Sequence, residues 1–104
     1  MVEKGPIYQI RWTNQYKKDV KLAKKRNYNI SELLEVVKKL SFGLPLEEKY
    51  KDHALEGNWK NHRELHIRPD WLLIYQIKDD ILILELSRTG THSDLFKKKF
   101  CRLS

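Results

Sequence analysis

Reactive side chains gather in the second half of the chain, at the ends of segments rich in β-branched and aromatic residues. They are His53, His66, Asp70, Arg88 and His92. Cleaving an RNA phosphodiester without a metal requires a base for the attacking hydroxyl, an acid for the leaving oxygen and a cation for the charge that develops on the phosphoryl group. Imidazole can serve in either proton-transfer role, and guanidinium matches phosphate with a planar fork. These residue types therefore indicate phosphodiester cleavage as one chemistry open to the chain.

Two aromatic residues and a run of lysines add candidate contacts to a nucleic acid. Trp71 and Phe96 each closely follow a reactive residue, so both rings are candidates for stacking on bases. Lys17, Lys21 and Lys24 fall in a predicted helix, where a row of ammonium groups can follow a phosphate backbone. The structural alternatives are that both rings belong to the hydrophobic core and that the lysines form a solvated helix face.

Each reactive residue also has a structural explanation when it is taken alone. His53 fits a hydrogen-bonded surface histidine, and Asp70 fits a turn. Arg88 could form an ion pair with Glu85 or Glu64. The occurrence of all these residue types on one basic chain favours the catalytic interpretation over the separate structural ones.

The sequence offers little for a metal centre. His62 and His66 have the four-residue spacing of metal ligands on a helix, but their segment has the pattern of a strand and no cysteine pair accompanies it. A metal-dependent hydrolase would need several converging carboxylates, and only Asp70 is well placed for that. We therefore expect no metal and no other cofactor.

The composition is that of one compact, basic domain. The chain has 104 residues, of which 40% are hydrophobic and 34% charged, and its formal net charge is +7. We expect a single domain over residues 1–104 and a polyanionic partner, with nucleic acid or an acidic protein ahead of a membrane. The single Cys101 excludes an internal disulfide, and the sequence shows no apolar run typical of a signal peptide or a membrane span. The expected location is the cytoplasm.

Two helices are predicted in the N-terminal half, after a short strand at residues 7–12. The first covers residues 14–26, with Thr13 as its N-cap. Its apolar face holds Tyr16, Val20 and Ala23. The second begins at a sequence similar to a capping box, residues 29–32, and ends before Gly43. Its apolar stripe holds Ile30, Leu33, Leu34, Val37 and Leu40.

Three strands are predicted after the helices, at residues 63–68, 71–77 and 81–86, with turns between them. Alternation in the first of these strands places Leu65 and Ile67 toward the helices. It places Glu64, His66 and Arg68 on the opposite face. The next two strands are apolar on both sides, as expected in the middle of a sheet. The chain should then turn polar and end in a short basic helix at residues 93–100.

Three ordered segments carry a specific resemblance: HALEG at residues 53–57, RELHIRPDWLLIY at 63–75 and RTGTHSDLF at 88–96. They closely resemble the YafQ family, the messenger-RNA-cleaving toxins of bacterial toxin–antitoxin modules within the RelE/ParE superfamily. The resemblance implies an α+β, RelE-like fold with two N-terminal helices packed on a curved, mainly antiparallel sheet of four to five strands. It implies functional roles for His53, His66, Asp70, Trp71, His92 and Phe96, with Arg88 as the phosphate contact. Residues 97–104 extend past these segments, and no role is assigned to them.

The resemblance also implies an activity and partners. The family's toxins are ribosome-dependent endoribonucleases that cut mRNA in the A site and inhibit translation. The expected reaction is attack by the ribose 2′-hydroxyl on the adjacent phosphate, which leaves a 2′,3′-cyclic phosphate and needs no metal. Asp70, supported by His66 and His53, is the candidate on the base side, and His92 is the candidate acid. The expected partners are mRNA, the ribosome and a cognate acidic, DinJ-like antitoxin in a heterotetramer of two toxins and two antitoxins.

Two other functions remain open on the sequence alone. A ParE-like toxin that poisons DNA gyrase shares the general fold, and a non-catalytic binding protein would also suit a basic chain. Neither needs a group of histidines and acids around one cleft. Three histidines together with Asp70 favour the nuclease.

Overall fold

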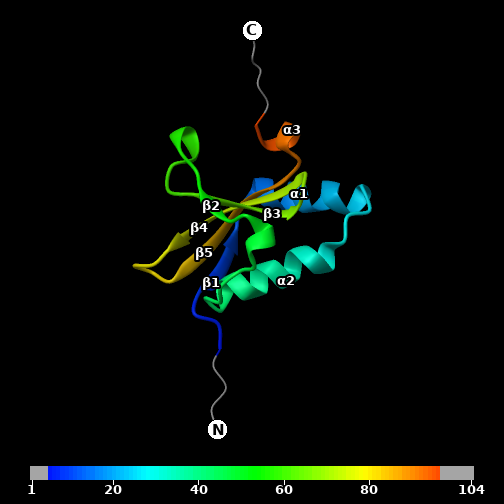
Figure 1. Ribbon diagram of the computed structural model, residues 1–104. Coiled ribbons are helices and arrows are strands. Elements are labelled where there is room, and N and C mark those ends of the chain that lie inside the picture. The colour runs from blue at the N-terminus through cyan, green and yellow to red at the C-terminus, as the bar shows by residue number, and fades with distance from the viewer. Residues whose placement is uncertain (1–4, 97–104) are drawn as a thin grey trace.

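The computed structural model describes residues 5–96 as a five-stranded sheet with the two longer helices, α1 and α2, on one face (Figure 1). In chain order the elements are β1 (Gln9–Trp12), α1 (Asn14–Lys25), α2 (Ile30–Ser41), η1 (Glu48–Tyr50), β2 (His53–Ala54), η2 (Gly57–Trp59), β3 (Arg63–Arg68), β4 (Trp71–Lys78), β5 (Ile83–Gly90) and α3 (His92–Leu95). The strand order is β1-β5-β4-β3-β2, with β1 parallel to β5 and every other pair antiparallel. The predicted α+β class, with two N-terminal helices on a mainly antiparallel sheet, is confirmed.

Both N-terminal helices begin at the predicted cap. The Thr13 hydroxyl accepts from the Tyr16 N–H at 3.0 Å, and the Asn29 side chain accepts from the Ser31 N–H at 3.0 Å, which satisfies backbone donors that no helical carbonyl can reach. The predicted apolar stripe of α2 is wrong at one position. Leu34 is 60% exposed, and Val36 is buried in its place, because Leu34 is rotated about 100° from its neighbour Leu33 on the helix.

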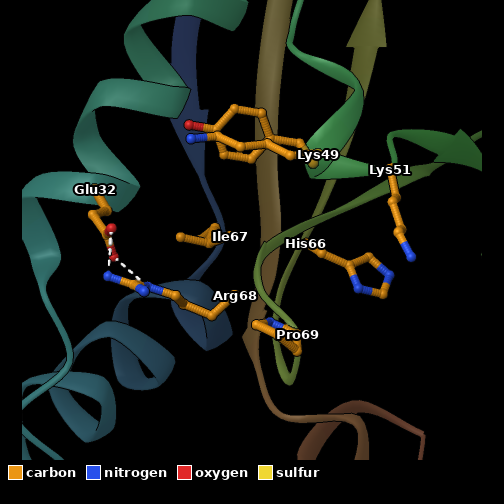
Figure 2. A pocket seen from close by; sticks show the side chains of 8 residues that line it. Glu32, Lys49, Lys51, His66, Ile67, Arg68 and Pro69 are labelled. Atoms are coloured by element: carbon orange, nitrogen blue, oxygen red, sulfur yellow. Dashed lines mark hydrogen bonds and ion pairs between the residues drawn. The ribbon is translucent and has the colours of Figure 1, made fainter.

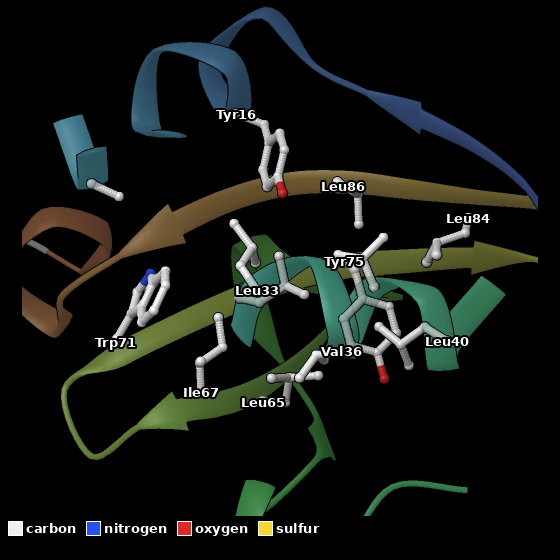
Figure 3. Packing of buried hydrophobic residues seen from close by; sticks show 13 residues of the cluster. Tyr16, Leu33, Val36, Leu40, Leu65, Ile67, Trp71, Tyr75, Leu84 and Leu86 are labelled. Carbon is white, nitrogen blue, oxygen red and sulfur yellow. The ribbon is translucent and has the colours of Figure 1, made fainter. Parts of the chain in front are cut away.

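The sheet separates two apolar clusters of unequal size. The larger lies between the helices and one face of the sheet (Figure 3). Its strand residues are Leu65, Ile67, Trp71, Leu73, Tyr75, Leu84 and Leu86. The smaller lies on the opposite face, with Leu72, Ile74 and Leu95 at its centre and Leu55, Trp59 and Phe96 packed around it. The second face is covered only in part, and the reactive residues lie there.

The last hairpin differs from the prediction at both ends of β5. The strand begins at Ile83 instead of residue 81, because Ile81 and Leu82 are exposed parts of the turn and Leu82 has a φ of 54°. It continues past the predicted end at residue 86, through the polar segment that follows, and ends at Gly90. The predicted C-terminal helix is present as α3, and residues 97–100 of that prediction lie outside the described part of the chain.

One predicted side-chain direction in β3 is also wrong. Alternation placed Arg68 on the face of His66, but the β3–β4 register shifts between these two residues. The Arg68 guanidinium instead donates to the Glu32 carboxylate of α2 at 2.9 and 2.7 Å.

Within residues 5–96, the structure contains no helix with the length and the apolar composition of a membrane span.

Candidate active site

Two strands bring two of the histidines to the sheet face opposite the helices. In the β3–β4 ladder, His66 pairs with Leu72 and Glu64 pairs with Ile74, and both apolar partners belong to the smaller cluster on that face. His53 is the cross-strand partner of Glu64 on β2, so its side chain shares the same face. The His53 and His66 ring centroids are 6.3 Å apart.

The third histidine enters from α3 and is held by the turn between β3 and β4. His92 Nδ1 lies 2.6 Å from Asp70 Oδ1, and the His92 backbone N–H donates to the same oxygen at 2.9 Å. The His92 ring is 5.7 Å from the His66 ring, edge to face. We call His53, His66, Asp70 and His92 the histidine cluster. The structure therefore brings four of the five predicted reactive residues together.

A buried carboxylate that sequence reasoning did not select completes this arrangement. Glu64 is buried, and its Oε1 lies 3.2 Å from His53 Nε2 and 3.7 Å from His66 Nε2. On the other side of the His53 ring, Nδ1 is 2.8 Å from the Lys51 carbonyl oxygen. A signal for Glu64 was present, because the alternation of β3 places it on the face of His66.

The charge state of Asp70 follows from its contacts with His92. The backbone N–H and then the imidazole of His92 lower the pKa of the Asp70 carboxyl, because both donate to its charged form. The carboxylate is therefore ionised at neutral pH. Hydrogen bonding by a charged carboxylate at Nδ1 fixes the orientation of the imidazole and leaves Nε2 free for proton transfer.

α3 is itself fixed in place by Asp94. The Thr91 hydroxyl and the Asp94 carboxylate form a capping box at the start of this helix, and Arg26, the C-cap residue of α1, donates to Asp94 at 2.7 Å. The Arg26 guanidinium is the main cause that lowers the pKa of Asp94 to about 2. A Cβ atom on Gly90 would come within 2.9 Å of the Asp94 carboxylate, so this close approach requires glycine.

The structure does not bring Trp71 to the histidine cluster. Its ring is 3% exposed and lies in the larger core, 4.8 Å from the Tyr28 ring. The indole N–H donates to the Thr89 hydroxyl at 3.0 Å. A ring enclosed in this way cannot stack on a base, so the expected substrate contact is corrected to a structural role.

Arg88 forms an ion pair with the first helix. Its Nε and Nη2 donate to the buried Asp19 carboxylate of α1 at 2.9 and 3.0 Å, and the Thr89 N–H donates to the same carboxylate at 3.1 Å. These bonds form an ion pair that joins β5 to α1, and the expected contact of Arg88 with a phosphate stays a prediction. The partner is Asp19, not Glu85 or Glu64 as the alternative had it.

The remaining predicted contacts lie on different sides of the sheet. Phe96 is half-buried and packs on the smaller cluster, on the face that carries the histidines. Lys17, Lys21 and Lys24 are exposed on α1, in the helix layer. Among the described residues, no hydrogen bond or ion pair joins these lysines to the histidine cluster.

The cluster has the groups that acid–base chemistry on a phosphate ester requires. Three imidazoles at successive centroid distances of 6.3 and 5.7 Å can present one proton acceptor and one proton donor to a single substrate. A charged carboxylate orients the outermost ring, and a second carboxylate lies between the other two. This is the geometry of a general acid–base site, and the histidines that form it come from three different elements.

Comparison with known proteins identifies close relatives. A family described as the bacterial toxin of a type II toxin–antitoxin system, YafQ, matches residues 8–97. The mRNA interferase toxin YafQ of Escherichia coli K12 is 48% identical over 88 residues, which are 84% of this chain and 94% of the relative. The crystal structure of the E. coli DinJ–YafQ toxin–antitoxin complex has a TM-score of 0.80 at 45% identity and covers 86% of this chain and 98% of the other. A metal-bound toxin from Helicobacter pylori has a TM-score of 0.81 at 43% identity, with 86% and 99% covered.

Proposed function

Because the chain belongs to the YafQ family of type II toxin–antitoxin toxins, we propose that it is a ribosome-dependent endoribonuclease that cleaves mRNA in the A site and so inhibits translation. The observation that carries the proposal is the convergence of His53, His66 and His92 on the open sheet face, with Asp70 bonded to His92. E. coli relatives are named mRNA interferases. The group of imidazoles has no purpose in a protein that only binds DNA gyrase.

The proposed reaction uses the ribose of the RNA as its nucleophile. One imidazole accepts the proton of the 2′-hydroxyl, whose oxygen attacks the adjacent phosphorus. The bond from phosphorus to the 5′-oxygen breaks, and a second imidazole gives that oxygen a proton. The products are a 2′,3′-cyclic phosphate and a 5′-hydroxyl, and the balance needs neither water nor a metal in this step.

The contacts favour particular residues for these roles. His92 is the acid, because Asp70 bonds its Nδ1 at 2.6 Å, which fixes the ring and leaves Nε2 free to give up a proton. His66, at the centre of the cluster, is the base. Asp70 is better placed as the residue that orients His92 than as the base itself, because the lowered pKa of its carboxyl makes it a weak proton acceptor.

Glu64 is proposed as a positioning residue. Its carboxylate lies 3.2 Å from His53 and 3.7 Å from His66, so one buried charge fixes the relative placement of two rings. His53 is also bonded to the Lys51 carbonyl, which leaves it little rotational freedom. His53 thus supports the base His66 and can add positive charge beside the phosphate.

The proposed partners follow from the family and the charge. A +7 chain favours an acidic partner, and the relative from E. coli has been solved as a complex with its antitoxin DinJ. We propose a DinJ-like antitoxin, with two copies of each chain, and cytoplasmic action on ribosomes. The exposed lysines Lys17, Lys21 and Lys24 would contact ribosomal RNA, since they lie away from the histidine cluster.

The proposal is tested by the ends of the RNA that the protein leaves. Purified protein is incubated with ribosomes that carry a defined mRNA, and the fragments are analysed by mass. The expected fragments have a 2′,3′-cyclic phosphate, and His92→Ala should abolish them while Ser93→Ala, on the same helix, leaves them unchanged. Fragments with a 3′-hydroxyl would overturn the mechanism.

Metal independence needs its own test, because a relative from H. pylori has been solved with a metal bound. Cleavage is measured after treatment of the toxin alone with EDTA and removal of the chelator, so that the ribosomes stay intact. Unchanged activity is expected. Loss of activity that zinc or copper restores would contradict the metal-independent reaction.

A further inference from the structure

A cavity of about 450 Å³ opens beside His66, and no step of the proposed reaction uses it. We call it the lysine pocket. It is lined by Glu32, Lys49, Tyr50, Lys51, His66, Ile67, Arg68 and Pro69. Figure 2 shows His66 and Lys51 at one end and the ion pair of Glu32 with Arg68 at the other. The pocket lies along the part of β3 that β2 leaves unpaired, since β2 pairs only with Arg63 and Glu64.

The charges that line the lysine pocket leave a surplus of positive charge. Glu32 and Arg68 bond to each other at 2.9 and 2.7 Å and so neutralise one another. Lys51 forms no ion pair with any residue that the structure describes. Lys49 lies 3.6 Å from Glu47, but both side chains are more than half exposed, at 69% and 62%, and such a pair is weak. Two ammonium groups therefore remain available to an anion.

The two lysines are also held in place by the surrounding structure. The Lys49 ammonium lies 5.2 Å from the Tyr50 ring centroid, a cation–π contact that restrains a flexible side chain. Lys51 has the left-handed backbone angles φ 50° and ψ 45°, which residues other than glycine rarely adopt. Its carbonyl oxygen meets His53 Nδ1 at 2.8 Å. The residue that presents a charge to the pocket thus also holds a member of the histidine cluster.

We propose that the lysine pocket binds a phosphate of the RNA strand next to the one that is cleaved. The proposal rests on the proposed function, since it assumes that RNA reaches His66. Because His66 belongs both to the cluster and to the pocket wall, a strand placed for cleavage continues into the pocket on one side. Arg88, the cation expected to meet the backbone, is bonded to Asp19, so the ammonium groups of Lys49 and Lys51 take that role. Such contacts position the strand without reading its sequence.

The test compares two double variants that remove the same charge. Lys49→Gln with Lys51→Gln empties the pocket of its ammonium groups. Lys38→Gln with Lys78→Gln removes two lysines from the end of α2 and the end of β4. The probe is a short, fully 2′-O-methylated RNA with a fluorescent label, which retains every phosphate but cannot be cleaved. Its dissociation constant is measured by anisotropy over a series of salt concentrations.

The pocket variant should bind the probe about tenfold more weakly. A plot of the logarithm of the association constant against the logarithm of the salt concentration should become less steep by about 1.4, which is about 0.7 for each lost contact with a single strand. In ribosome-dependent cleavage its KM should rise while kcat stays within about twofold. The control variant should change the affinity by less than about twofold. Thermal unfolding of both variants checks that the fold is intact.

Other outcomes separate the pocket from the reaction. If both double variants bind the probe equally weakly, the effect is one of net charge alone, and the proposal that the lysine pocket binds a phosphate is wrong. An unchanged affinity in the pocket variant, or a wild-type protein that does not bind the probe, would overturn it as well. If binding depends on Lys49 and Lys51 but the wild-type protein cuts no RNA, the pocket stands and the proposed nuclease function fails.

Discussion

The imidazole of His92 and the carboxylate of Asp70 are joined twice through one oxygen atom. Asp70 Oδ1 lies 2.6 Å from the ring Nδ1 and accepts the backbone N–H of His92 at 2.9 Å. The first contact orients the ring, and the second attaches the start of α3 to the turn between β3 and β4. A change at Asp70 therefore affects both the orientation of the His92 ring and the attachment of α3.

Replacing Asp70 by asparagine should lower kcat for RNA cleavage by about 100-fold or more, because the amide cannot stabilise a protonated imidazole as a charged carboxylate does. Asp80→Asn, in the exposed turn after β4, is the matched control and should keep full activity. Cleavage is measured on ribosomes, and circular dichroism confirms the fold. A variant that retains a third of the wild-type rate would show that the contact is not part of the mechanism.

Glu64→Gln should lower kcat by about tenfold with little change in KM, because the amide has the shape of the carboxylate but lacks its charge. Glu64→Asp should recover part of kcat. Glu85→Gln, at a partly exposed site on β5, serves as the control. A rise in KM without a change in kcat, or no recovery of kcat in Glu64→Asp, would contradict the positioning role.

Asp19→Ala should lower the free energy of unfolding by about 3 kcal/mol, because it leaves the Arg88 guanidinium without its buried partner. Arg88→Ala should cost a similar amount, since it leaves the Asp19 carboxylate buried and unpaired. Urea denaturation measures both, with the exposed Asp80→Ala expected within about 0.5 kcal/mol of wild type. If Arg88→Ala abolishes cleavage at full stability, Arg88 is a phosphate contact after all.

Asp94→Asn should destabilise the protein in a pH-dependent way. Arg26 lowers the pKa of Asp94 from 3.8 to about 2 in the folded state, so the stabilisation is complete above pH 3.8 and is lost as the pH falls through about 2. At pH 7 the loss should be about 1 kcal/mol, because the pair is partly exposed to solvent. The stability difference between variant and wild type is measured from pH 7 downward. A stability difference that stays constant down to pH 2 would show that it does not come from the ion pair of Asp94 with Arg26.

The sequence allowed the elements and the reactive face to be predicted from local patterns. Alternation in β3 placed His66 opposite the helix-facing Leu65, and the caps at Thr13 and Asn29 marked the starts of both long helices. Each of these signals depends on neighbours in the chain. The convergence of His53 and His92 with His66 was expected from the family resemblance and from the ends of predicted strands.

The errors concern contacts between residues far apart in the chain. Nothing local links Asp19 to Arg88, which are 69 positions apart, so the sequence does not predict this ion pair. Trp71 begins β4, and only the cross-strand register reveals that Thr89 is placed to accept its indole N–H. Arg68 leaves the face of His66 because the ladder shifts by one residue, and no local pattern in the sequence predicts that shift.

The central claim is that the histidine cluster cuts mRNA during translation, and mapping the 5′ ends of cellular mRNA tests it most directly. Wild-type protein and His92→Ala are induced to the same level, together with a reporter whose start codon is present or removed. New 5′-hydroxyl ends should appear inside translated codons with the wild-type protein only, and they should disappear from the reporter that lacks its start codon. The same ends with His92→Ala, or no new ends with the wild-type protein, would contradict the claim.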